Sequence, residues 1–136
     1  MTEDGYQELN HTADIAIRVQ GEDLGDILRN AASGMLDLME FPPGEPSGEV
    51  LQLEIDALDE EDLLVAWLQE ILYVLETRGI GLGRMEIHVL DEWRLKAQLE
   101  ALGEMKPSKE IKAVTYHGLE IKEIDGKLEA TVVFDV

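Results

Sequence analysis

The sequence of 136 residues contains no cysteine. This absence excludes disulfide bonds, thiolate zinc sites, iron–sulfur clusters and a cysteine nucleophile. No apolar run approaches the roughly 20 residues that a membrane-spanning helix needs. The first ten residues, MTEDGYQELN, are polar and acidic, unlike a signal peptide. We therefore expect a cytoplasmic protein with no membrane association.

Basic residues are also scarce, because 11 Lys and Arg stand against 30 Asp and Glu, for a formal net charge of −19. Proteins that bind nucleic acids usually carry a basic patch, so we expect no direct nucleic-acid binding. Cations and basic protein surfaces remain attractive partners. The alternative interpretation is a solvated acidic surface that only confers solubility.

Apolar residues make up 45% of the chain, as is ordinary for a folded domain. The length favours a single domain over residues 1–136. Apolar side chains recur at helical spacing between Leu24 and Leu38, after the N-cap candidate Asp23. A second and stronger helix pattern follows the N-cap candidate Asp59 and ends near Gly79.

Alternation of apolar and polar residues predicts strands at residues 14–20, 51–56, 85–89 and 93–101. The last of these segments also fits a helix. Residues 41–48 (FPPGEPSG) hold three of the four prolines and are predicted to form a loop. No glycine-rich phosphate-binding loop follows any of these strands.

The end of the chain shows a hairpin pattern. The dipeptide Asp125-Gly126 is typical of a type I′ turn. The register then places two apolar pairs opposite each other, which are Leu119 with Val132 and Ile121 with Ala130. Two helices and about six strands predict an α+β two-layer sandwich, with a largely antiparallel or mixed sheet and both helices on one face.

Carboxylates at two distant points of the chain predict a cation site. Asp14 opens the first patterned strand, and Asp135 ends the last one beside the α-carboxylate of Val136. If the fold brings them together, three oxygen-bearing groups converge, and such groups are the ligands that Ca²⁺ and Mg²⁺ prefer. The alternatives are solvated carboxylates at a frayed end, and a turn before the first strand that Thr12 and Asp14 close and His11 caps.

Blocks that span nearly the whole chain resemble the archease family. They are residues 11–15 (HTADI), 30–35 (NAASGM), 62–73 (DLLVAWLQEILY), 111–117 (IKAVTYH) and 134–136 (FDV). The first motif alone is a weak signal. Its combination with the lysine-containing block and with the last three residues makes the resemblance specific.

The resemblance implies a non-catalytic activator of the GTP-dependent RNA ligase that joins 2′,3′-cyclic phosphate or 3′-phosphate ends to 5′-hydroxyl ends in tRNA splicing. It implies that the protein promotes ligase guanylylation and multiple turnover, with the ligase as its partner. It also implies a metal site, described with calcium, at Asp14, Asp135 and Val136. Mg²⁺ and Mn²⁺ also accept oxygen ligands and remain alternatives.

Further residues are candidates for supporting or partner-contact roles, namely His11, Thr12, Lys112, Thr115 and His117. Lys112 could contact a phosphate or a partner carboxylate, or pair with one of the many acids of the chain. His117 could orient a metal-bound water, or be an ordinary hydrogen-bonding histidine.

Two other functions stay open from the sequence. One is a metal-dependent hydrolase built on Asp14, Asp135 and His117, which lacks a clear general base. The other is a chaperone-like accessory protein of RNA modification, for which no exposed apolar surface is predicted.

Overall fold

The computed structural model describes residues 5–10, 14–91 and 93–136, and within them it contains two helices and eight strands. Their bounds, in chain order, are β1 Tyr6–Asn10, β2 Asp14–Gly21, α1 Leu24–Met39, β3 Pro46–Asp56, α2 Glu60–Arg78, β4 Ile80–Asp91, β5 Arg94–Glu104, β6 Ala113–Thr115, β7 Lys122–Ile124 and β8 Lys127–Asp135. No helix of the described segments is long and apolar enough to cross a membrane.

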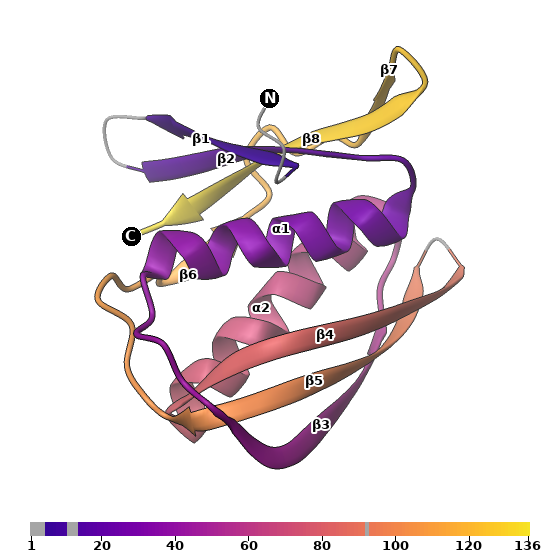
Figure 1. Ribbon diagram of the computed structural model, residues 1–136. Helices are drawn as coiled ribbons and strands as arrows, with labels where there is room; N and C mark the ends of the chain where they lie inside the picture. The colour runs from indigo at the N-terminus through magenta and orange to yellow at the C-terminus, as the bar shows by residue number, and fades with distance from the viewer. Residues whose placement is uncertain (1–4, 11–13, 92) are drawn as a thin grey trace.

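The strands form two separate antiparallel sheets, with the helices between them (Figure 1). The terminal sheet has the order β1-β2-β8-β6, and β7 also pairs with β8. The middle sheet has the order β3-β5-β4. The predicted α+β class and antiparallel pairing are confirmed, whereas the strands divide between two sheets instead of forming one.

Both helices begin and end where the sequence predicts. The Asp23 carboxylate accepts from the backbone N–H of Asp26 at 2.9 Å, which caps α1, and Asp59 caps α2 in the same way. Helix α2 ends at Gly79, whose φ of 63° is a left-handed conformation that glycine adopts without strain. Capping therefore accounts for the helix bounds.

Helix α2 explains why two sheets form. Its buried residues do not follow a single stripe, because they include neighbours such as Leu63, Leu64 and Val65 as well as Trp67 and Leu68. A helix that is apolar over most of its circumference must be covered from several sides. The terminal sheet and α1 cover part of this surface, and the middle sheet covers the rest (Figure 1).

Two strands differ from the sequence-based predictions, namely β1 and the beginning of β3. Strand β1 was not predicted, because its sequence YQELN lacks a clear alternation. The loop predicted over residues 41–48 is shorter, since β3 begins at Pro46, and an edge strand can accommodate proline. The segment 93–101, whose pattern fits either a strand or a helix, is a strand from Arg94 onward, within β5.

The structure confirms the turn of the predicted C-terminal hairpin, but its two strands pair over fewer residues than predicted. Asp125 and Gly126 both have positive φ, as a type I′ turn requires. The predicted register holds over β7, where Lys122 lies opposite Glu129. The predicted pairing of Leu119 and Ile121 with β8 is wrong, because the ladder of β7 with β8 begins only at Lys122. The backbone N–H of Ile121 donates to Glu61 of α2 at 2.9 Å.

The two tryptophans of the chain provide a test of the helix packing. Trp67 is fully buried, and its indole N–H donates to the carbonyl oxygen of Leu28 in α1 at 2.9 Å. We expect Trp67→Phe to lower the free energy of unfolding by about 2 kcal/mol, because it removes this hydrogen bond and part of a buried ring. Urea unfolding measures the change. The matched control Trp93→Phe, at a side chain that is 45% exposed, should cost less than about 0.5 kcal/mol.

Candidate carboxylate site at the β2–β8 pair

The pairing of β2 with β8 brings the two distant carboxylates together. In this antiparallel register Asp14 lies directly opposite Asp135, and Ile15 lies opposite Phe134. Residues that face each other in this way have Cβ atoms about 4.5–5.5 Å apart. The two aspartates are therefore neighbours on one face of the terminal sheet. This proximity is the condition that the predicted cation site depends on.

This face is the one turned away from the helices. Ile17 and Phe134 are fully buried in the core that the helices share with the terminal sheet. Because side chains alternate along a strand, Asp14 and Asp135 point to the opposite side. Asp14 is half-buried, Asp135 is exposed, and Val136 follows with 39% of its surface exposed.

The two carboxylates have no cationic partner among the described residues. Like charges directly opposite each other destabilise a pair of strands, and a bound cation would remove the repulsion. Their oxygens are hard donors and suit a hard cation such as Ca²⁺. No group of three or more His, Cys, Asp or Glu that could hold a metal occurs in residues 5–10, 14–91 and 93–136. A cation bound by the pair thus needs further donors.

Strand β6 extends the sheet on the other side of β8. Ala113 lies opposite Asp135, and the backbone N–H of Lys112 donates to the carbonyl oxygen of Asp135 at 2.8 Å. The Lys112 side chain is exposed and forms no ion pair within the described segments. The structure therefore places Lys112 beside the aspartate pair.

The remaining candidates lie further from the pair or outside the described residues. Thr115 lies opposite Val133, one step along the same face, and its hydroxyl accepts from the backbone N–H of His117 at 3.2 Å. His117 is exposed beyond the end of β6. His11 and Thr12 fall outside the described residues.

Side chains of α2 hold the segment around β6, and the sequence did not indicate them. The side-chain oxygen of Gln69 accepts from the backbone N–H of Val114 in β6. The hydroxyl of Tyr116 donates to the Asp62 carboxylate. Asp62 looked like a helix-dipole residue in the sequence, and no local pattern links it to a tyrosine 54 residues away.

The hydrogen bond between Asp62 and Tyr116 changes the pKa of both side chains. The Tyr116 hydroxyl, helped by the backbone N–H of Leu58, holds the pKa of Asp62 below its ordinary 3.8. In return the hydrogen bond to Asp62 raises the pKa of Tyr116 above 10.0. The ionised carboxylate and the neutral phenol are therefore the stabilised forms.

Comparisons with known proteins agree on one family. The model of the Archease protein family matches residues 6–136. Protein archease of Methanosarcina mazei is 34% identical, over 96% of this chain and 95% of its own length. Protein archease of Methanopyrus kandleri is 33% identical, over 96% and 99% of the two chains.

Two solved structures are similar in fold. The solution structure of Methanobacterium thermoautotrophicum protein 1598 has a TM-score of 0.76 and 29% identity, and the alignment covers 98% of this chain and 99% of that one. The crystal structure of a Thermotoga maritima archease, described there as a possible chaperone, has a TM-score of 0.69 and covers 96% of each chain. At 23% identity, the second comparison shows the fold alone.

The Asp62–Tyr116 contact predicts a pH-dependent difference in stability. Tyr116→Phe should lower the free energy of unfolding at pH 7 by about 0.5 kcal/mol, the size of an exposed charged contact. Because the folded pKa of Asp62 is depressed, this difference is complete above about pH 4 and is lost as the pH falls through the folded pKa. Urea unfolding between pH 2.5 and 7 measures it.

The matched control is Tyr73→Phe, which removes the hydroxyl from an exposed tyrosine of α2. It should leave the free energy of unfolding unchanged at every pH. A difference between wild type and Tyr116→Phe that stays constant down to pH 2.5 would contradict the assignment to Asp62.

Proposed function

Because this chain belongs to the archease protein family, we propose that it activates a GTP-dependent RNA ligase. The ligase joins 2′,3′-cyclic phosphate or 3′-phosphate RNA ends to 5′-hydroxyl ends, as in tRNA splicing. The protein promotes guanylylation and multiple turnover of the ligase and performs no chemical step itself. The observation that carries the proposal is the position of Asp14 opposite Asp135 on adjacent strands.

Charge supports a partner of this kind. An enzyme that binds two RNA ends needs a positively charged groove. A chain with a net charge of −19 is attracted to such a surface, and this attraction raises the rate of encounter. The protein and the RNA then compete for one positive surface, so the activator leaves before the RNA ends bind.

The aspartate pair is the part of this surface that we assign to a divalent cation. Asp14, Asp135 and the α-carboxylate of Val136 would hold it, with Ca²⁺ as the first choice and Mg²⁺ or Mn²⁺ as alternatives. When bound, the cation supplies positive charge that removes the repulsion between the carboxylates. Lys112 adds an exposed ammonium group beside the pair, suited to a phosphate or a carboxylate of the ligase.

A hydrolase has less support than an activator. A metal-dependent hydrolase needs a general base beside its metal ligands. His117, the third residue of the hydrolase hypothesis, lies beyond the end of β6 at Thr115, whereas Ala113 at the start of β6 is the residue opposite Asp135. Incubation of the purified protein alone with phosphoester substrates tests this alternative.

Substitution of the paired aspartates tests the activator function. We expect Asp14→Asn and Asp135→Asn each to reduce the stimulation of ligase guanylylation at least about tenfold, as the loss of groups at a metal site typically does. Single-turnover guanylylation with GTP, with and without this protein, is the measurement.

The matched control is Asp125→Asn, the same change at the exposed turn between β7 and β8. This variant should stimulate the ligase like wild type. Normal stimulation by both Asp14→Asn and Asp135→Asn would refute the proposal.

The cation assignment has its own test, which needs no ligase. At a free Ca²⁺ concentration about 100 times its Kd, a cation that binds only the folded state adds about 2.7 kcal/mol to the free energy of unfolding. Asp14→Asn and Asp135→Asn should abolish this gain. In EDTA the same variants should be more stable than wild type by about 0.2–1 kcal/mol, because a like-charge pair is gone.

Thermal unfolding of wild type and variants in Ca²⁺, Mg²⁺ and Mn²⁺, at matched ionic strength, measures the stability gained from each cation. Asp125→Asn should keep the full gain, which separates a local site from general screening of the acidic surface. An unchanged Ca²⁺ effect in Asp135→Asn would remove that residue from the site.

A further inference from the structure

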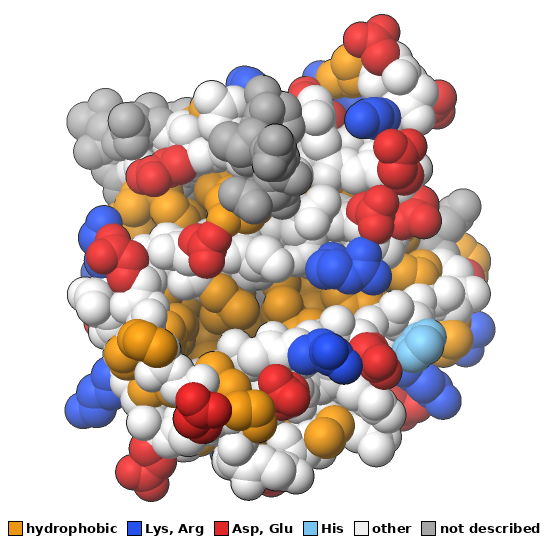
Figure 2. Space-filling view, viewed as in Figure 1, with side chains coloured by type: hydrophobic (Ala, Val, Ile, Leu, Met, Phe, Trp, Pro, Cys, Tyr) orange, Lys and Arg blue, Asp and Glu red, His pale blue; other side chains and the backbone are white. Residues whose placement is uncertain are grey.

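A groove between α1 and β4 crosses the molecule on the side of α1 that faces the middle sheet. Figure 2 shows it as a recessed band with apolar side chains along its floor. One end is a cavity of about 340 Å³, whose apolar lining includes Leu36, Phe41 and Met85. The other end, of about 360 Å³, is lined by residues that include Ile87 and Val89. We call these two cavities and the strand between them the α1–β4 groove.

The lower wall of the groove is the open edge of a sheet. Strand β4 pairs with β5 alone, and the register is unbroken from Met85 to Val89. Within the described residues, the backbone of this stretch has no hydrogen-bond partner outside that ladder. In an antiparallel edge strand, alternate residues direct their N–H and C=O groups away from the sheet. The groove therefore offers unpaired backbone donors and acceptors.

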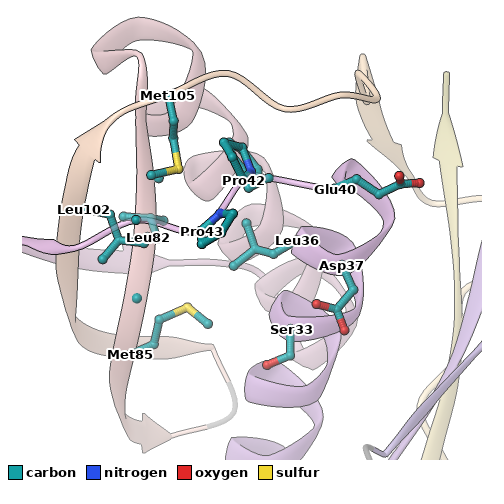
Figure 3. Close-up of a pocket in the computed structure, with 14 residues that line it drawn as sticks. Ser33, Leu36, Asp37, Glu40, Pro42, Pro43, Leu82, Met85, Leu102 and Met105 are labelled. Carbon is teal, nitrogen blue, oxygen red and sulfur yellow. The ribbon is translucent and has the colours of Figure 1, made fainter.

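At the 340 Å³ end, part of the cavity wall is formed by the backbone of β4. Gly81 and Gly83, which have no side chains, line the 340 Å³ cavity together with Leu82, in a stretch where the register of β4 with β5 is irregular. Figure 3 shows Met85 and Met105 extending toward this space from β4 and from the segment after β5. Methionine side chains adapt to varied apolar groups.

The charges around the groove select the kind of partner. Asp37 and Glu40 line one end, and Asp23 and Asp26 line the other, whereas Arg29, the one cation among the described residues that line either cavity, is already paired with Asp26. On the strand between the cavities, the charges of exposed Arg84 and exposed Glu86 offset each other. Glu40 is paired with the exposed Lys109. Carboxylates thus outnumber cations at both ends, on a chain whose net charge is −19. A basic partner is attracted, and a phosphate backbone is repelled.

We propose that the α1–β4 groove binds an extended segment of a partner protein, which adds a strand to the open edge of β4. Its apolar side chains enter the two cavities, and its Lys or Arg side chains meet the carboxylates at the ends. From Gly81 to Val89 the groove is about 26 Å long, so the segment has about eight residues. Backbone hydrogen bonds supply affinity, and the alternate side chains supply specificity.

A second copy of this chain does not suit the groove, because two molecules of charge −19 repel each other. The partner segment carries the opposite charge, and its binding should therefore weaken as salt is added.

Hydrogen exchange of the wild-type protein tests the proposal without any substitution. The probe is a synthetic decapeptide in which lysine alternates with valine and leucine. At a peptide concentration about ten times its Kd, exchange of the outward amides of Met85–Val89 should slow about tenfold. Strand β3 is the internal control, because it is the other open edge of the same sheet and should not change.

Two altered peptides separate strand addition from simple charge attraction. A peptide methylated at alternate backbone nitrogens keeps the charge but cannot pair along one edge, and it should give no protection of β4. A peptide with glutamate in place of lysine keeps the strand pattern and should also fail, because its charge is repelled.

The absence of cysteine allows a direct location of the bound peptide. Ser33→Cys lines the 340 Å³ cavity, and Thr77→Cys lies on the exposed last turn of α2 as a matched control. With a maleimide photocrosslinker, Ser33→Cys should capture the decapeptide at least about tenfold better than Thr77→Cys, since capture follows the local peptide concentration.

Three results would overturn the proposal. The first is equal protection of β3 and β4 by the peptide. The second is full protection by the methylated peptide. The third is protection of β4 that rises with protein concentration in the absence of peptide, which would assign the edge to a second copy. None of these outcomes depends on the aspartate pair or on ligase activation.

Discussion

The pairing of β2 with β8 is the constraint on which the rest of this structure depends. Its register places Ile17 and Phe134 in the core and, on the opposite face, sets Asp14 beside Asp135. Because side chains alternate, a slip of β8 by one residue would turn Asp135 toward the helices and Phe134 toward solvent. Burying an unpaired carboxylate costs far more free energy than the core could regain. The packing of the core thus enforces the meeting of the two carboxylates.

Helix α2 connects this sheet to the remainder of the molecule. Its apolar residues contact α1 and both sheets, and Trp67 adds a hydrogen bond to the backbone of α1. Its polar residues Asp62 and Gln69 hold the segment that carries β6, the strand next to Asp135. The position of Lys112 beside the aspartate pair is therefore a consequence of how α2 is packed.

The acidic surface contributes little to the stability of the fold. The ion pairs of the described residues are exposed, such as Lys96 with Glu54 and Lys109 with Glu40, and exposed pairs contribute at most about 1 kcal/mol each. No charged side chain is buried in the part of the chain that the structure describes. The apolar core stabilises the protein, and the excess of carboxylates remains available to basic partners and cations.

The sequence by itself determined the elements whose signals are local. Caps at Asp23 and Asp59 set the helix starts, and the turn at Asp125 and Gly126 set the hairpin, because each depends on a few neighbouring residues. Only the tertiary structure decided that the strands form two sheets, that Leu119 and Ile121 lie outside the ladder of β7 with β8, and that residues 14 and 135 meet. Strand alternation indicates which face is apolar but not which edges pair, since pairing depends on how all the apolar faces are covered together.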